Sequence, residues 1–157
     1  MVFFVCPEGK CGNLAPGHDE RLDSVKNYNA GDIFQGAGFI KSSLDDMMFW
    51  LKAHMGLLQT PLSDAMELSH RPYFEVGGVT YNELEGYFIL SIGFSWHIHE
   101  IPGSYTYIWH GGRTNGYMAY MAFDPDASTG LVLLCNQSSE NIILQFGDDL
   151  VQALHHY

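Results

Sequence analysis

The chain has 157 residues, a length that fits one domain, and such a domain buries roughly 68–70% of the surface that its unfolded chain exposes. Its 18 acidic residues outnumber the 7 lysines and arginines, and the formal net charge is −11. This balance argues against sequence-independent binding of nucleic acid, which depends on neutralising phosphates. No apolar run approaches the roughly 20 residues of a membrane-spanning helix, so we expect no membrane span.

The N-terminal region, residues 1–36, predicts an irregular arm. From residue 6 onward it is rich in glycine, asparagine, aspartate and proline and shows little periodicity, apart from room for one short extended piece. Its first residues have no basic segment, and their apolar run is shorter than the roughly 7–15 residues of a signal peptide. We therefore see no export signal, and the compartment stays unknown.

The cysteine count is odd, which limits the possible disulfides. Cys135 lies in an apolar run and is expected to be a small buried hydrophobic residue, so that only Cys6 and Cys11 could pair. No second pair of Cys or His stands near enough to complete a tetrahedral set, and a zinc site there is not expected. We interpret Cys6 and Cys11 as loop residues.

Two helices are predicted in the first half of the chain. Ser43 can cap the first helix, and Asp46 three residues later completes a capping-box pattern. Apolar residues at helical spacing then continue to a stop near Gly56; they are Leu44, Met47, Met48, Leu51 and Met55. A second, shorter helix is expected from Thr60-Pro61 to about Ser69, because proline is tolerated in a first turn.

The second half changes to the pattern of strands. Aromatic and β-branched runs separated by turn residues predict strands at 87–98, 105–110, 117–123 and 131–135, of which the last three form a meander. A closing helix, capped by Ser138 or Ser139, would bury one apolar stripe: Ile142, Ile143, Phe146, Leu150, Val151 and Leu154. Helices, strands and a final helix indicate the α+β class, without internal repeats.

Two pairs of histidines have alternative interpretations. His97 and His99 stand two apart on a predicted strand, so both side chains leave one face and could grip a metal ion. We favour the other interpretation, a polar pair on a solvated strand face, and expect no metal or other cofactor. His155 and His156 end the last helix, where a positive charge interacts favourably with the helix dipole. We expect both side chains to be solvated at the terminus.

The usual serine nucleophile patterns are absent from these 157 residues. There is no Gly-x-Ser-x-Gly sequence. In the alternative pattern, Ser-x-x-Lys on a helix, the lysine lies one turn from the hydroxyl. None of the chain's lysines has a serine three residues before it; they are Lys10, Lys26, Lys41 and Lys52. The sequence therefore supplies no recognisable nucleophile.

The stretch from His110 to Tyr117 carries the clearest chemical signal. A predicted strand ends at His110, and two glycines follow that would let a ligand approach the backbone closely. Arg113 adds a cation for an anionic substrate, and Asn115 adds an amide before the next strand. The alternative is a tight glycine-rich hairpin with a chance histidine.

Four segments together resemble the C-terminal part of the serine β-lactamase and penicillin-binding protein superfamily, with the pattern of class C β-lactamases. His110-Gly111-Gly112 resembles the family's third motif, usually Lys-Thr-Gly, and a class C-like Thr114-Asn115-Gly116-Tyr117 follows it. The segment 36–47 resembles the family's helix entry, and Ile92 to Trp96 its Gly-Leu-Gly-Trp strand. Order and spacing agree from about residue 14 to the end.

The resemblance implies a fold and roles for site residues. Residues 1–157 would form a single, incomplete β-lactamase-like domain, with a meander packed by a C-terminal helix and a small helical segment. His110 would replace the lysine that orients a substrate carboxylate and assists proton movement. Gly111, Gly112 and Arg113 would line the substrate, with one oxyanion N–H after Gly112, and Asn115 would contact a carboxylate.

The family's nucleophilic and second motifs lie upstream of the matched region, so two functions stay open. The chain is either a segment of a hydrolase that acts on β-lactam, D-Ala-D-Ala peptide or ester bonds and is inactive alone, or a non-catalytic remnant that binds a ligand or partner. The expected ligand is a carboxylate-bearing small molecule or peptide. In the family's five-stranded sheet, the strand at 131–135 pairs with an N-terminal strand, so we expect a homo-oligomer or a complementing N-terminal segment.

Overall fold

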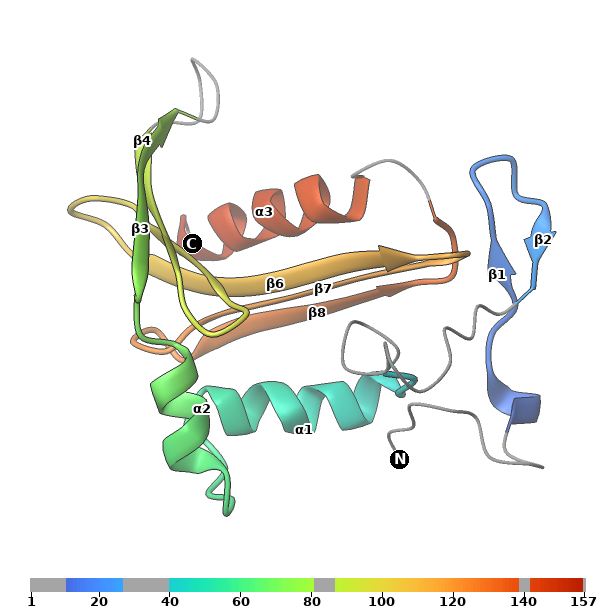
Figure 1. Ribbon diagram of the computed structural model, residues 1–157, viewed down its shortest axis with the longest axis horizontal. Helices are drawn as coiled ribbons and strands as arrows, with labels where there is room; N and C mark the ends of the chain where they lie inside the picture. Colours follow the sequence, from blue (N-terminus) through green and yellow to red (C-terminus); the bar gives the residue numbers. More distant parts are fainter. Residues whose placement is uncertain (1–10, 27–39, 81–86, 139–141, 157) are drawn as a thin grey trace.

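A computed structural model describes residues 11–26, 40–80, 87–138 and 142–156 of the chain. Within these residues, two α-helices precede an antiparallel six-stranded sheet, and a third α-helix follows it (Figure 1). The helices are α1 (Leu44–His54), α2 (Ser63–Ser69) and α3 (Ile142–His155). The strands of the large sheet are β3 (Phe74–Thr80), β4 (Tyr87–Ile92), β5 (His97–Glu100), β6 (Thr106–Thr114), β7 (Tyr117–Asp124) and β8 (Thr129–Cys135). None of the described helices has the length and apolar character needed to cross a bilayer.

Both predicted helices of the first half are present, and the first is capped as expected. The Ser43 hydroxyl oxygen accepts the backbone N–H of Asp46 at 3.2 Å, and the hydroxyl lies 2.9 Å from the Asp46 carboxylate. Gly56, with φ of +72°, follows the end of α1. The second helix begins three residues later than predicted, because Thr60 and Ser63 bond each other in a turn that precedes it.

The sheet is a simple meander in the order β3-β4-β5-β6-β7-β8, which confirms the predicted meander of the last three strands. The predicted strand at 87–98 is in fact two strands, because the Gly93 N–H donates to the Trp96 carbonyl and closes a turn in which Ser95 has φ of +63°. β3 was not predicted, since its two glycines weaken the pattern of a strand. One of them, Gly77, has φ of +111° at a bulge opposite β4.

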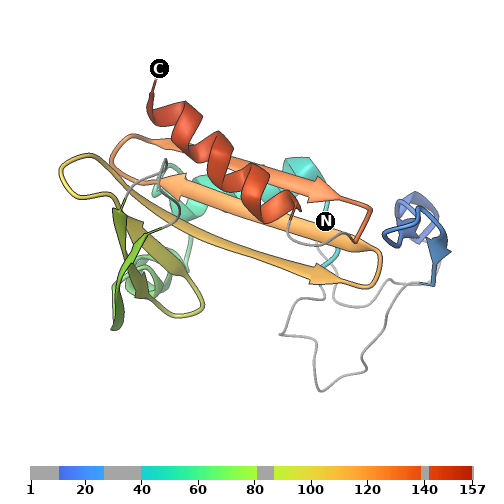
Figure 2. The same cartoon turned by 90° about the horizontal axis from the view of Figure 1, so that it is seen from above.

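Helices cover both faces of the sheet (Figure 1). On one face, α1 packs its buried Leu51 against Ile108, Met121 and Phe123 of the sheet. On the other face, Val151 of α3 packs against the buried residues Tyr107, Tyr120 and Ala122. Figure 2 shows α3 lying across the three long strands β6, β7 and β8. The α+β class is therefore confirmed.

The buried stripe of α3 differs from the prediction. Ile142, Phe146 and Leu154 are 63%, 49% and 48% exposed, whereas Gly147 and Asp148 are buried. The predicted stripe contains only apolar positions, whereas the buried Tyr120 of β7 also needs an acceptor for its hydroxyl and space for its ring. Asp148 supplies the acceptor, and Gly147 supplies the room.

The described part of the N-terminal arm contains a short 3-10 turn, Cys11–Asn13, and two paired strands, β1 (Gly17–His18) and β2 (Ser24–Val25). It lies at the end of the large sheet opposite the β3–β4 hairpin (Figure 1). Backbone hydrogen bonds between His18 and the residues that follow β8 fix it there. Cys6 lies outside the described residues, so the interpretation of Cys6 and Cys11 is not tested, and Cys135 is half-buried rather than buried.

Candidate active site

The candidate site lies where β6 extends beyond the end of the neighbouring strand β5. β5 pairs with residues 106–109 of β6 and then stops, whereas β6 continues to Thr114 alongside β7. From His110 onward, no described strand pairs with the side of β6 that faces β5. This stretch therefore presents unpaired backbone N–H and C=O groups, which can bond an extended ligand.

His110 stands at the start of the unpaired stretch. Strand alternation places it on the α1 face with Ile108, and its ring lies 6.3 Å from that of Trp96. His110 keeps contact with solvent, yet burial by its surroundings lowers its pKa below the usual 6.5. A ring with a lowered pKa is neutral at pH 7 and can accept a proton.

The two glycines of the motif have different surroundings. A Cβ on Gly111 would lie 2.5 Å from the Leu144 side chain and 3.1 Å from the Ala119 carbonyl, because α3 crosses the strand there. A Cβ on Gly112 would meet nothing within 4 Å. Packing thus explains Gly111, and Gly112 is the position that is open to a ligand.

Arg113 and Asn115 turn toward the N-terminal arm. The Arg113 guanidinium lies 3.9 Å from the Glu20 carboxylate, and both side chains are exposed. Asn115 lies in the β6–β7 turn, and its side-chain amide donates to the Lys26 carbonyl at 3.4 Å. Tyr117, just beyond this turn, donates to the Ala15 carbonyl at 2.7 Å, so the Thr-Asn-Gly-Tyr segment holds the arm.

His97 and His99 leave the same face of β5, but neither interpretation from the sequence fits them. His99 is buried, and its Nε2 accepts the indole N–H of Trp109 at 3.0 Å, so that its Nδ1–H donates to the Tyr107 hydroxyl at 2.7 Å. Burial, and then the charge of His97, lower the pKa of His99 to about 4. No group of three metal-ligating side chains exists among the described residues.

His155 also has a specific role that its position at a helix end did not reveal. Its Nδ1 lies 2.8 Å from the Val151 carbonyl and its Nε2 lies 2.9 Å from the Asp124 carboxylate, and the two side chains are only 10% and 4% exposed. The ring stacks on Tyr105 with centroids 3.7 Å apart. His155 therefore fastens the end of α3 to the β7–β8 turn and does not solvate the terminus.

Sequence reasoning missed Trp96 and His97 as neighbours of the candidate site. The His97 and His110 rings lie 6.0 Å apart, although 13 positions separate them in the chain. Only the pairing of β5 with β6, which sets His97 opposite Trp109, brings them together. A sequence pattern gives the period of a strand but not its partner.

The fold matches the C-terminal part of the class C β-lactamase fold, which confirms the architecture that the motifs predicted. A class C beta-lactamase structure aligns with TM-score 0.73 at 19% identity, over 98% of this chain and 46% of that one. A D-alanine carboxypeptidase AmpC from Burkholderia cenocepacia aligns with TM-score 0.77 at 18% identity, over 97% and 50%. A beta-lactamase from Pseudomonas fluorescens is 27% identical over 89% of this chain and 45% of its own length.

The match of the Beta-lactamase family model over residues 4–153 settles the family. This chain belongs to the beta-lactamase family, as the resemblance of its motifs indicated. It spans about half the length of the relatives that it matches.

Proposed function

We propose that this chain supplies one wall of the active site of a β-lactamase-related serine hydrolase, and that the nucleophile comes from outside these 157 residues. The reaction would be hydrolysis of a β-lactam, a D-Ala-D-Ala peptide or an ester through an acyl-enzyme. Residues 1–157 would form a single incomplete domain. The observation that carries the proposal is the unpaired end of β6, which offers His110 and the open position Gly112 to a ligand.

The chemistry of this wall suits acyl transfer. A backbone N–H after Gly112 would donate to the oxygen that gains charge in the transition state, and preorganised donors of this kind are a large term in such reactions. His110, neutral at pH 7 because burial lowers its pKa, would accept or pass on a proton and bond the substrate carboxylate when it is protonated. Gly111 would keep α3 close behind the strand, while Arg113 and Asn115 would border the far end of the ligand.

Without a nucleophile, these donors give binding and not turnover. No Ser-x-x-Lys occurs in the sequence, and Ser139-Glu140-Asn141, which fits the family's second motif by letters, follows the last strand. Residues 139–141 lie outside the described part of the chain. The proposal therefore requires a serine from outside these 157 residues, on a further segment of the same protein or on another chain.

The test is a complementation assay with a chromogenic cephalosporin and with p-nitrophenyl acetate. The chain would be assayed alone and mixed with a separately expressed N-terminal region of a class C β-lactamase that carries Ser-x-x-Lys and Tyr-x-Asn. We expect no turnover by the chain alone and measurable turnover by the mixture. Replacing His110 with alanine should lower the turnover of the mixture by roughly 10²–10⁴-fold, the usual contribution of an acid–base group.

The matched control is His156→Ala, because His156 is exposed near the end of the chain, outside the candidate site. It should leave the turnover unchanged. Turnover by the 157 residues alone would refute an external nucleophile. Binding of D-Ala-D-Ala without turnover in any mixture would favour the non-catalytic function instead.

A further inference from the structure

A second imidazole, that of His97, lies beside His110 at the edge of the candidate site. His97 begins β5, and its ring lies nearly parallel to that of His110, with centroids 6.0 Å apart and an angle of 23° between the planes. Neither ring has a hydrogen-bonding partner among the described residues. The nitrogen atoms of both rings are therefore available to a ligand.

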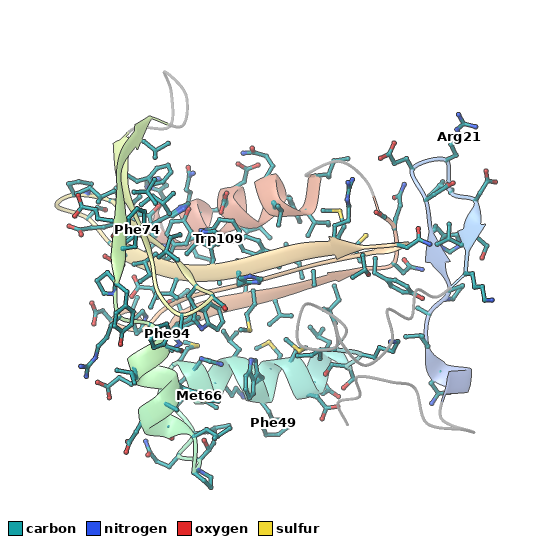
Figure 3. The ribbon with its side chains drawn as sticks, viewed as in Figure 1. Arg21, Phe49, Met66, Phe74, Phe94 and Trp109 are labelled. Atoms are coloured by element: carbon teal, nitrogen blue, oxygen red, sulfur yellow. The ribbon has the colours of Figure 1, made fainter. Side chains whose placement is uncertain are left out.

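The position of His97 is fixed from behind by Trp109. The His97 ring stacks on the Trp109 indole with centroids 4.5 Å apart, and the indole N–H donates to the buried His99. His99 in turn bonds Tyr107. Figure 3 shows Trp109 on the side of β6 that faces α3. A ring held by such a support cannot swing away from His110 without breaking the stack.

The other titratable groups near the pair lie behind Trp109 or behind Trp96. His99 of β5 interacts with His97. On the α1 face, His54 of α1 and His70 at the end of α2 contact the Trp96 ring, which separates them from His110.

The residues paired with His97 on β4 and with His110 on β7 are uncharged. β4 opposes His97 with Ile92, and β7 opposes His110 with Met121. On α3, the Asp148 carboxylate accepts from the tyrosines Tyr107 and Tyr120. Each of the two rings therefore has the other as a directly stacked titratable neighbour.

We propose that His97 is a positioning residue of the candidate site. Its ring, which stacks on Trp109, allows the His97–His110 pair to hold one proton but opposes the binding of a second proton. Two positive charges at this distance repel each other, and the proton of one ring therefore weakens the proton affinity of its neighbour. Burial and this repulsion both lower the pKa of His97. One ring is then left neutral when the other is charged.

A neutral His110 suits the proposed hydrolysis, and this consequence alone rests on that proposal. When His97 carries the proton of the pair, His110 would stay neutral and could accept the proton that leaves the nucleophile.

The experiment is a histidine titration of the complete 157-residue chain, without substrate, by NMR of ring-labelled protein. We expect His97→Phe and His97→Gln to raise the titration midpoint of His110 by a similar amount. The expected rise is roughly 0.5–2 pH units, from Coulomb's law at this separation with effective dielectric constants between 80 and 20. His110→Phe should raise the midpoint of His97 by the same amount, because the coupling is reciprocal.

The two replacements of His97 separate charge from packing, since phenylalanine keeps the stack on Trp109 and glutamine does not. A shift in the glutamine variant alone, or in neither variant, would overturn the proposal. His156→Gln is the control, and an equal shift there would show a general charge effect and would also overturn it. Because no substrate is present, this outcome is independent of whether the hydrolysis assay succeeds.

Discussion

Gly111 and Gly112 are adjacent in the chain and stand in opposite environments. Strand alternation turns one toward α3 and the other toward open space, so the sequence motif His-Gly-Gly combines a packing requirement with an accessible position. Single residues of the motif therefore make separable predictions.

Replacing Gly111 with valine should destabilise the protein by roughly 1–3 kcal/mol, because the new side chain would overlap Leu144 and the Ala119 carbonyl. Gly112→Val is the matched control and should be neutral or slightly stabilising, since its site is open and valine favours strands. Urea unfolding followed by circular dichroism measures both. Equal effects of the two replacements would contradict this account of Gly111.

Gly147 lies in the interior of α3, although glycine usually destabilises a helix there. A Cβ on Gly147 would lie 2.6 Å from the ring of Tyr120, which is 1% exposed and donates to Asp148 at 2.7 Å. The ring cannot move aside without losing this hydrogen bond. Glycine is therefore required here by a contact with β7.

Gly147→Ala should lower the free energy of unfolding by about 1–3 kcal/mol through overpacking, although the same change in an exposed helix stabilises it by about 1 kcal/mol. Thermal unfolding would show the loss. In the Tyr120→Leu background the cost of Gly147→Ala should shrink, because the ring is gone. A cost that is the same in both backgrounds would place the cause elsewhere.

The contact between α1 and α2 gives the protein a pH-sensitive element. His54 Nδ1 lies 2.8 Å from His70 Nε2, and the His54 Nε2 is buried without a hydrogen-bonding partner among the described residues. The pKa of each ring is lowered to about 4, mainly by burial, with a further contribution at His54 from the charge of His70. Both rings are neutral in the folded protein at pH 7.

The unfolded chain takes up these protons near pH 6.5 and the folded chain only near pH 4, so stability should fall as the pH drops from 6.5 toward 4. We expect a loss of about 3 kcal/mol from each ring by pH 4. Replacing His54 with leucine should flatten the dependence, while His156→Gln should leave it unchanged. Urea unfolding at several pH values tests this, and an unaltered slope in His54→Leu would exclude the pair as the cause.

At the scale of the whole molecule, β8 is one of the two edge strands of the described sheet. No described strand pairs with its outer edge, and Leu134 on this strand is 45% exposed. Ile142 and Phe146 of α3 add exposed apolar surface on one face of the sheet. An open apolar edge recruits another chain.

We expect the isolated chain, without a complementing segment, to scatter with a mass above its own 17.6 kDa, as a homo-oligomer. Leu134→Lys should shift the mass toward the monomer, because a charge on an edge strand opposes pairing. Leu57→Lys is the control, at an exposed position in the loop after α1. A monomeric mass for the unaltered chain across a concentration series would contradict the expectation.

Local sequence signals were sufficient to predict most of the helices and strands. The Ser43 cap, the meander and the final helix follow from interactions between residues close in the chain, which leave periodic patterns. β3 was not predicted, since it contains two glycines, and β5 was merged with β4 in one predicted strand, because only a turn separates the two. Their pairing stabilises them where their own pattern is weak.

By itself, the sequence determined the family, the α+β order of elements and the place of the His-Gly-Gly motif on a strand. The tertiary structure decided which groups surround that motif: His97 beside His110, α3 behind Gly111, and the arm at Asn115. The reason is physical. Periodicity and capping depend on neighbours along the chain, whereas these contacts depend on strand register and helix packing, which join residues that the chain keeps far apart.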